Sequence, residues 1–390
     1  VYHGHPCEKR VKQLLAPVGL DDTPVITHRF AYEPQHTDVR DAYNHRTSYR
    51  YSLEQRLTAI EHYLGTEKHV LYSLDKLFWG DPKTEQGSEL QSRVICYPDG
   101  TVRSCRWLEY DSNRNVTAEH ILGNLSGQQT VPVELDANGI PLDNGSERYT
   151  IRRTFTNDRF RLIQSESYPN GRSVDYRYKP GSNLLTAKLT RDNGSVVLRE
   201  FHDYDGNAAM TRTIRDDGSG EHPDDLTHVT LRKVTIITPR TQQPCIGLPE
   251  VIEERYWDPV TGIERQLQRL VKHYTCEGWC RREEHYDANN SLAYVLTWEH
   301  DTYGNAILEQ DALGRITTRR FDPFGNKLYE QGPDTSYHIE YLYDYANRLV
   351  SESRIGHAGE IQTLSYRYDL RGNKVASIDA LGNETTHRYD

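Results

Sequence analysis

The sequence of 390 residues has few of the side chains that fill deep hydrophobic cores. It contains one Met and seven Phe, and hydrophobic residues make up 36% of the chain, a little below the usual share in globular domains. No run of 18 apolar residues occurs, so the sequence offers no candidate for a membrane-spanning helix. The formal net charge of −10 argues against nonspecific binding of nucleic acid, which needs basic patches.

Motifs for catalysis are also absent from the sequence. It has no His-Glu-x-x-His, no Gly-rich phosphate loop followed by Lys-Ser/Thr, and no Gly-x-Ser-x-Gly. The many Asp residues recur at turn positions, which favours a structural role over paired acid/base carboxylates. We therefore predict a protein that is not an enzyme and that uses no cofactor.

Cysteine is sparse and irregularly spaced. The six residues are Cys7, Cys96, Cys105, Cys245, Cys276 and Cys280. The segment Cys276-Glu-Gly-Trp-Cys280, with His273 and His285 nearby, is compatible with a zinc site, with a disulfide across a turn, or with unpaired packed thiols. Cys96 and Cys105 flank an Asp-Gly turn and form a second candidate pair.

Tyrosine, in contrast, is abundant, with 27 residues in the chain. A Tyr ring packs against apolar atoms while its hydroxyl reaches water. This composition predicts a thin wall with a large exposed area. The aromatic content also distinguishes the chain from a disordered one.

A short motif, Asp-x-x-Gly-(Asn/Arg), recurs along the chain and indicates an internal repeat. It occurs at 301–305, 311–315 and 322–326, in steps of 10 and 11 residues, so that one unit is 21 residues long. The strict form Asp-x-x-Gly-Asn appears five times.

Each motif predicts a tight turn. An Asp side chain accepts hydrogen bonds from the backbone two residues on, and Gly or Asn tolerates the positive φ that such a turn needs. The residues predicted to form these turns are Asp203, Gly206, Asn207, Asp301, Gly304, Asn305, Asp311, Gly314, Asp322, Gly325, Asn326, Asp344, Asp369, Gly372, Asn373, Asp379, Gly382 and Asn383.

The segments between turns have the length and pattern of strands. They are five or six residues long and favour β-branched and aromatic residues in alternation, as in 316–321. Each unit is therefore a hairpin. We predict an all-β fold, a long antiparallel meander that forms a curved or spiralling sheet.

Local signals conflict with the repeat between residues 37 and 80. Ser52-Leu-Glu-Gln55 matches a helix capping box, and apolar residues follow on one helical face. Yet residues 41–51 align with 311–321 and 379–389. We favour strands at 47–51 and 56–63, because helix propensity is the weaker signal.

The repeat divides the chain into four regions. Residues 1–36 form an irregular or strand-like lead-in, in which His3-Gly-His5-Pro-Cys7 is a weak metal candidate, and residues 37–220 carry degenerate repeats. Residues 221–250 contain several Pro residues. This region is either a boundary between two repeat arrays or an insertion within one wall, and the sequence does not distinguish the two. Residues 251–390 carry the clear repeats.

An aromatic residue often precedes the repeat Asp. The aromatic residues assigned to this position are Tyr51, Tyr286, Phe321, Tyr343, Tyr368 and Tyr389. From Tyr286 onward this pattern resembles the YD repeat of the Rhs family, which includes bacterial Rhs toxins, the B and C components of ABC toxin complexes, and teneurins. The match is looser before Tyr286.

The resemblance implies a function. In the family, the repeats wind a β-sheet into a hollow shell that encloses a toxic C-terminal polypeptide. It implies a secreted or cell-surface protein, whose partners are the rest of a longer chain, including the cargo, and other toxin-complex subunits. This sequence shows neither the family's protease core nor a cargo domain. An adhesive or glycan-binding surface module is the alternative.

Overall fold

The computed structural model describes residues 10–17, 20, 23–66, 68–81, 87–128 and 131–389. In this part of the chain all regular elements are strands, 28 in number. Every strand pairs antiparallel with the next one along the sequence, from β1 (Gln13–Pro17) with β2 (Pro24–Glu33) to β27 (Lys374–Ile378) with β28 (Glu384–Thr386). The predicted antiparallel meander is therefore confirmed. No helix that could cross a bilayer occurs among the described residues.

The strands of the first half are short to medium in length. They are β3 (His36–Asp41), β4 (Arg46–Tyr51), β5 (Leu57–Leu64), β6 (Val70–Trp79), β7 (Leu90–Cys96), β8 (Val102–Tyr110), β9 (Val116–Gly123), β10 (Arg148–Phe155), β11 (Ile163–Ser167), β12 (Arg172–Tyr178), β13 (Leu185–Asp192) and β14 (Ser195–Tyr204).

The second half continues in the same way. Its strands are β15 (Met210–Asp216), β16 (Arg232–Pro239), β17 (Pro249–Asp258), β18 (Ile263–Tyr274), β19 (Cys280–Tyr286), β20 (Leu292–His300), β21 (Ala306–Gln310), β22 (Ile316–Phe321), β23 (Lys327–Gln331), β24 (Tyr337–Tyr343), β25 (Leu349–Gly356) and β26 (Ile361–Tyr368).

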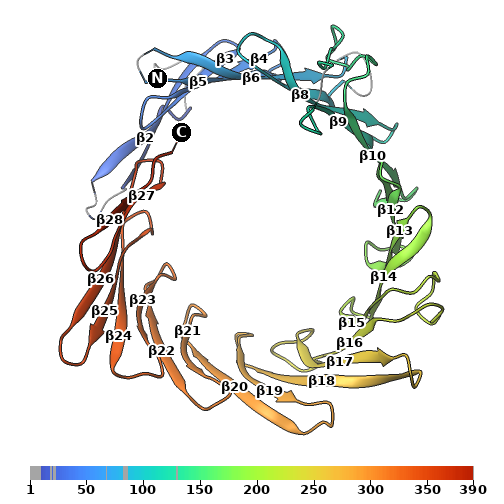
Figure 1. The fold of residues 1–390 in the computed structure, drawn as a ribbon, viewed down its shortest axis with the longest axis vertical. Coiled ribbons are helices and arrows are strands. Elements are labelled where there is room, and N and C mark those ends of the chain that lie inside the picture. Colours follow the sequence, from blue (N-terminus) through green and yellow to red (C-terminus); the bar gives the residue numbers. More distant parts are fainter. Residues whose placement is uncertain are drawn as a thin grey trace.

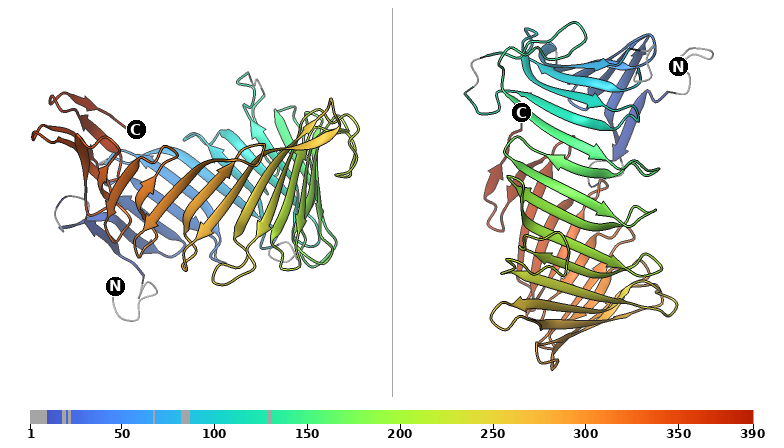
Figure 2. Two further views of the ribbon diagram at one scale, coloured as in Figure 1. Left: turned by 90° about the horizontal axis from the view of Figure 1, so that it is seen from below. Right: turned by 90° about the vertical axis from the view of Figure 1, so that its right-hand side faces the viewer.

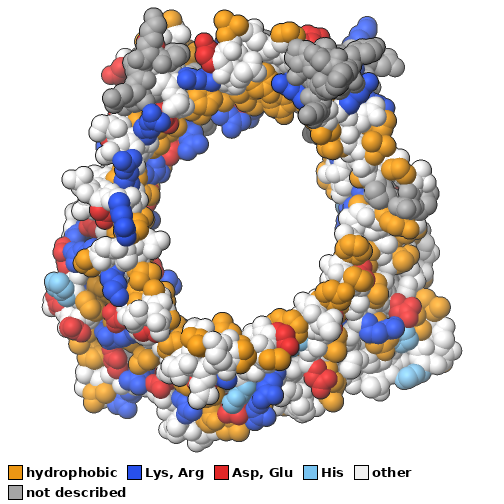
Figure 3. All heavy atoms as spheres, turned by 180° about the vertical axis from the view of Figure 1, so that it is seen from behind, with side chains coloured by type: hydrophobic (Ala, Val, Ile, Leu, Met, Phe, Trp, Pro, Cys, Tyr) orange, Lys and Arg blue, Asp and Glu red, His pale blue; other side chains and the backbone are white. Residues whose placement is uncertain are grey.

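The sheet is a single layer that curves around an open space. Figure 1 shows the strands following one another around a ring, with the C-terminal strands returning beside the N-terminal ones. The two sheet ends lie at different heights along the ring axis, so the wall is one winding of a spiral (Figure 2). The opening remains free when all described atoms are drawn as spheres (Figure 3).

The connections form two rims of the wall. We call the rim at which even-numbered strands end rim A, and the rim at which odd-numbered strands end rim B. The turns at 301–305 and 322–326 lie on rim A, whereas the turn at 311–315 lies on rim B. The 21-residue repeat thus returns the chain to the same rim after one hairpin.

The outer face of the wall carries two small hydrophobic cores. One contains Val94, Cys105 and Leu122 and packs against Val133 from the connection 124–147. The other contains Leu189, Phe201, Ile214 and Val234, beside the connection 217–231. Both connections lie on the outside of the ring, and the second crosses the front of the wall in Figure 2. Without such cover, a single layer has no second layer to bury its face.

Ion pairs between neighbouring strands line the opposite, inner face. Glu119 on β9 lies between Arg106 on β8 and Arg153 on β10, with N–O distances of 2.6 and 3.1 Å. Arg153 continues to Glu166 on β11 at 2.9 Å. Opposite charges on adjacent strands stabilise a sheet face that has no apolar partner. We call this series the ion-pair ladder.

The two open questions about chain organisation have structural answers. Strands β4 and β5 occupy the region of the conflicting helix signal, so the favoured strand interpretation is confirmed. Between 216 and 250, β15 pairs with β16 and β16 with β17, so the sheet continues through this region and 217–231 is an insertion. The segment from His3 to Cys7 lies outside the described residues.

Candidate functional site

The repeat Asp residues close the turns with their side chains. At the turn 301–305, Oδ1 of Asp301 accepts hydrogen bonds from the backbone N–H groups of Tyr303 and Asn305, at 2.9 and 3.0 Å. The backbone N–H of Gly304 also bonds to the carbonyl of Asp301 at 3.2 Å. The equivalent bonds form at Asp311, Asp322, Asp344, Asp369 and Asp379. These Asx-type turns match the geometry that the sequence predicts.

The fifth residue of the motif has a role that the sequence did not reveal. Asn305 donates its side-chain amide to Oδ2 of Asp301 at 2.9 Å, and Asn326, Asn373 and Asn383 do the same in their own turns. In the turns of Asp311 and Asp344 an Arg replaces Asn and donates through Nε at 2.7 Å. Asn or Arg recurs here because both can satisfy the second carboxylate oxygen.

These hydrogen bonds favour the charged carboxylate. The side-chain amide of Asn305, helped by backbone N–H groups, lowers the pKa of Asp301. Asn383 lowers the pKa of Asp379 in the same way. The turns are therefore most stable when their Asp residues are ionised.

The fourth residue of each turn has a positive φ. Gly304, Gly325 and Gly372 have φ values of 91°, 85° and 92°. Asn347 takes the same position after Asp344 with a φ of 58°. Residues with a Cβ pay a steric penalty in this region, which explains why Gly dominates there.

One predicted turn is displaced by two residues. Asp203 lies in β14, and the turn is closed by Asp205, whose Oδ1 accepts from the N–H groups of Asn207 and Ala209 at 2.8 and 2.9 Å. Ala208 carries the positive φ of 66°, so Gly206 is not in the position that requires Gly. The prediction that Asp203 forms the turn is wrong. Asp205 directly follows Tyr204, the last residue of β14, and it closes the turn although Ala208 and Ala209 depart from the motif.

Aromatic residues at or just after strand ends form hydrogen bonds across the open ends of the hairpins at rim A. The hydroxyl of Tyr368, the last residue of β26, donates to the carbonyl of Leu349, the first residue of β25, at 2.8 Å. Tyr389 donates to the carbonyl of Lys374, the first residue of β27. The same bond, from the end of a hairpin to its first carbonyl, is made by Trp79, Tyr110, Tyr178, Tyr204 and Tyr274.

The other predicted aromatic residues also end strands, but their contacts differ. The hydroxyl of Tyr286 bonds to Glu284 at 2.8 Å. Phe321 has no hydroxyl, and Tyr51 and Tyr343 end β4 and β24. At each of these four residues the strand register shifts by one, as it does at Tyr368. A bulge at this point turns the last side chain of the strand in a new direction.

The cysteines are free thiols among the described residues. Cys96 and Cys105 are buried in the outer core, and burial raises the pKa of Cys105 to about 12. Cys276 and Cys280 are likewise unpaired. No group of three or more metal-ligating side chains is found in the described ranges. The thiols in this part of the chain therefore act as packed or exposed side chains.

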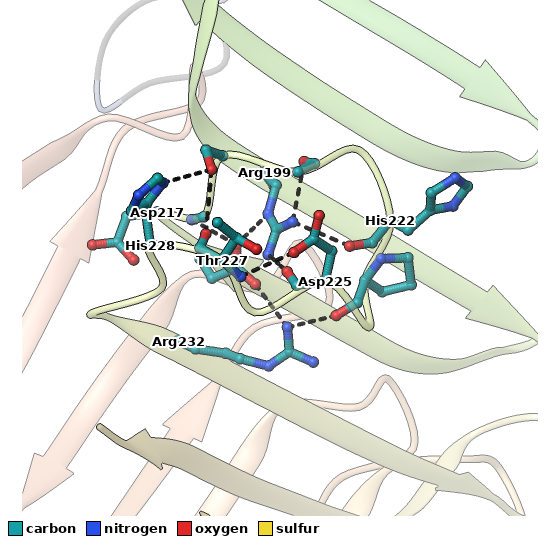
Figure 4. Close-up of polar contacts among 12 residues, drawn as sticks. Arg199, Asp217, His222, Asp225, Thr227, His228 and Arg232 are labelled. Atoms are coloured by element: carbon teal, nitrogen blue, oxygen red, sulfur yellow. Dashed lines mark hydrogen bonds and ion pairs between the residues drawn. The ribbon is translucent and has the colours of Figure 1, made fainter. Parts of the chain in front are cut away.

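A buried guanidinium holds the connection 217–231 against the wall (Figure 4). Arg199 is fully buried and bonds to Asp216 Oδ1 at 2.6 Å. Its other nitrogens donate to the carbonyls of Gly220, His222 and Asp225 at 2.9–3.1 Å. These bonds replace the hydration that the buried charge has lost.

Comparisons with known proteins concern the fold alone. No family model and no curated protein matches the chain. Among solved structures it is similar to TcdB2–TccC3 without its hypervariable C-terminal region, at 14% identity and a TM-score of 0.46, over 91% of this chain and 17% of that one. It is also similar to the Tc holotoxin pore of Photorhabdus luminescens, at 10% identity and a TM-score of 0.30, over 92% and 24%.

A porin-like protein from Bacteroides uniformis matches at 10% identity and a TM-score of 0.22, over 62% of this chain and 91% of that one. The chain thus spans about a sixth of the length of the TcdB2–TccC3 chain and about a quarter of the holotoxin chain.

Proposed function

We propose that this chain is a wall segment of a hollow β-shell that encloses another polypeptide, and that it does so without catalysis. The observation that carries the proposal is the single-layer wall around an unobstructed opening (Figure 3). A compact domain fills its interior with side chains. Here the space inside the ring is left for a partner.

The inner face supports this role. On β8–β11 and on β21–β23 the ion-pair ladder presents charges that already have partners. A polypeptide that lies against these strands therefore finds few free charges to bind. From the resemblance to YD-repeat toxins, we propose that the enclosed polypeptide is a toxin or effector and that the assembly is secreted or lies on the cell surface.

The rims are the surfaces for further subunits of such an assembly. Apolar side chains stand out from the turns, with exposed fractions of 76% for Leu313, 80% for Phe324 and 88% for Leu381. Leu313 and Leu381 lie on rim B and Phe324 on rim A, so both rims present apolar side chains to solvent. We propose that the rims contact the rest of the shell or other toxin-complex subunits.

Particle imaging of the full-length protein tests the enclosure. We expect a hollow particle with density inside that is lost when the enclosed polypeptide is deleted. A particle without internal volume would refute the proposal. A glycan array that detects strong, specific binding to an intact particle would instead favour the adhesive alternative.

A further inference from the structure

The ion-pair ladder on the inner face is interrupted near rim A, between β19 and β20. The β19–β20 ladder ends at the pair Arg282–Thr297, and Trp279, Arg281, Trp298 and His300 lie between this pair and rim A. These four residues are among those that line an open pocket of about 490 Å³. We call these four residues the aromatic seat.

Trp298 places the aromatic seat at the inner face. It pairs with Glu309 of β21, whose carboxylate belongs to the ladder through Arg319, which also contacts Glu330, at 2.9 Å each. On the other side, Lys272 of β18 and Glu283 of β19 form an ion pair at 2.8 Å. Trp298 therefore lies between two groups of ion pairs. A β-bulge in β19 at Arg281 interrupts the regular alternation here.

The aromatic seat contains hydrogen-bond donors without partners. Arg281 lines the pocket together with Trp298 and forms no ion pair or hydrogen bond with any described residue. Neither indole N–H, of Trp279 or of Trp298, has an acceptor in the described part of the chain. The Nδ1 atom of His300 is buried and also lacks a hydrogen-bond partner.

Two of the carboxylates around the pocket are already engaged. Asp301 uses both carboxylate oxygens to close its turn. Glu277 accepts a hydrogen bond from the Cys276 thiol at 2.8 Å. Glu299 also lines the pocket and is exposed. The pocket thus combines apolar ring faces with donors that have no acceptor among the described residues.

The position of Trp279 is fixed by the next turn. A Cβ atom on Gly304 would lie 2.9 Å from the indole of Trp279, so the Gly backbone packs directly on the ring. The ring centroids of Trp279 and His300 are 5.6 Å apart. A preorganised aromatic surface binds at a lower entropic cost than a mobile one.

We propose that the aromatic seat binds an extended segment of the enclosed polypeptide, with one large apolar side chain against the indole rings. Backbone carbonyls or a neighbouring carboxylate of that segment accept hydrogen bonds from Arg281 and the indole N–H groups. The inference rests on the proposed function, because the inner face is where an enclosed polypeptide lies. A saccharide is the alternative occupant that the test must distinguish, because its hydroxyl groups also accept hydrogen bonds.

Two variants on one strand test the proposal with a matched control. Arg281 faces the seat, whereas Arg282, the next residue, bonds to Glu284 on the outer face at 2.9 Å. The labelled chain is applied to an array of short synthetic peptides and, separately, to a glycan array. We expect binding to peptides in which a Phe, Trp or Leu adjoins an Asp or Glu.

Arg281→Ala and Trp298→Ala should each weaken this binding more than about tenfold, and Arg282→Ala should leave it unchanged. Equal urea midpoints for Arg281→Ala and the unmodified chain will show that the fold is intact. Peptide binding that survives Arg281→Ala and Trp298→Ala overturns the proposal, as does specific binding to glycans alone.

This test is independent of the imaging of the full-length protein. If peptides bind the aromatic seat but the particle has no interior, the proposed shell fails and the binding site stands. If the particle is hollow but peptide binding does not depend on the seat, this inference fails and the shell stands.

Discussion

Arg371 and Asp41 are 330 positions apart in the sequence, and they join the two ends of the wall with an Nε–Oδ2 distance of 2.7 Å. Arg371 belongs to the turn 369–373 on rim A, and Asp41 closes the turn 41–45 on rim B. The guanidinium also lies over the ring of Tyr43, and the Tyr43 hydroxyl accepts from the N–H of Leu370 at 2.9 Å. After one winding, rim A therefore rests on rim B.

Arg371→Ala should loosen this contact without unfolding the chain. A partly exposed ion pair contributes less than about 1 kcal/mol to global stability, but no strand pairing holds the two ends together. We expect faster hydrogen exchange in the segments 369–373 and 41–45, with an unchanged urea midpoint. Arg315→Ala is the control, because Arg315 bonds within its own turn to Asp311. Equal exchange in both variants would contradict the assigned role.

The displaced turn at Asp205 provides a second test. Gly325→Ala places a Cβ at a φ of 85° and should destabilise the chain by about 1–2 kcal/mol. Gly206→Ala replaces the Gly of the same motif. It should lower the free energy of unfolding by less than about 0.5 kcal/mol, since Gly206 has open space around it and no positive φ. Urea denaturation of both variants measures the difference, and equal losses would show that the turn is at Asp203.

Removing one aromatic hydroxyl should weaken one hairpin. Tyr368→Phe leaves the carbonyl of Leu349 without its partner and should cost about 1 kcal/mol. Tyr303→Phe is the control, because Tyr303 is 68% exposed in its turn and its hydroxyl reaches solvent. Thermal unfolding of both variants measures the difference in stability. If Tyr368→Phe loses no more stability than Tyr303→Phe, the packing of the Tyr368 ring, and not its hydroxyl, stabilises the hairpin.

Stability should fall in acid. Hydrogen bonds lower the pKa of Asp301 and Asp379 in the folded chain, and Arg106 and Arg153, opposing the effect of burial, lower that of Glu119. Groups with a lowered folded pKa contribute stability above their unfolded values of about 3.9 and 4.3, and lose it as the pH falls through the folded values. Urea midpoints should be constant from pH 6 to 5 and decrease below about pH 4. A midpoint that rises in acid would exclude this account.

Arg199→Ala should be the most damaging of these substitutions. It leaves Asp216 buried without one of its partners and frees three carbonyls of the connection 217–231. Breaking a buried pair in this way costs about 3–5 kcal/mol. We expect protease cleavage within 217–231 at concentrations that spare the unmodified chain. Arg215→Ala, which removes an exposed pair with Glu200, should remain resistant.

The sequence was sufficient to predict the meander and most turns, because each turn depends on residues within five positions. Asp301, Gly304 and Asn305 satisfy one another locally. The capping-box pattern at Ser52 also depends on local hydrogen bonds, which is why it conflicts with the repeat. A Ser at a helix N-terminus and a Ser in a turn both accept backbone N–H groups a few residues on. Here Ser52 Oγ accepts from the N–H of Arg56 within a turn.

Features that depend on register could not be predicted. The acceptor of Tyr368 lies 19 residues earlier, and nothing in the intervening sequence reveals how many residues the hairpin pairs. The aromatic seat brings Trp298 of β20 near Trp279, which precedes β19, and a register shift of one residue would turn Trp298 to the other face. The Arg371–Asp41 contact depends on the curvature of the whole wall.

Because every strand of the wall pairs with the one made just before it, the chain can gain its structure hairpin by hairpin as it leaves a ribosome or a secretion channel. Each added hairpin needs only its predecessor as a template, and no segment waits for a distant one to appear. In the proposed shell, a wall that assembles in this order is already in place when a polypeptide C-terminal to it emerges.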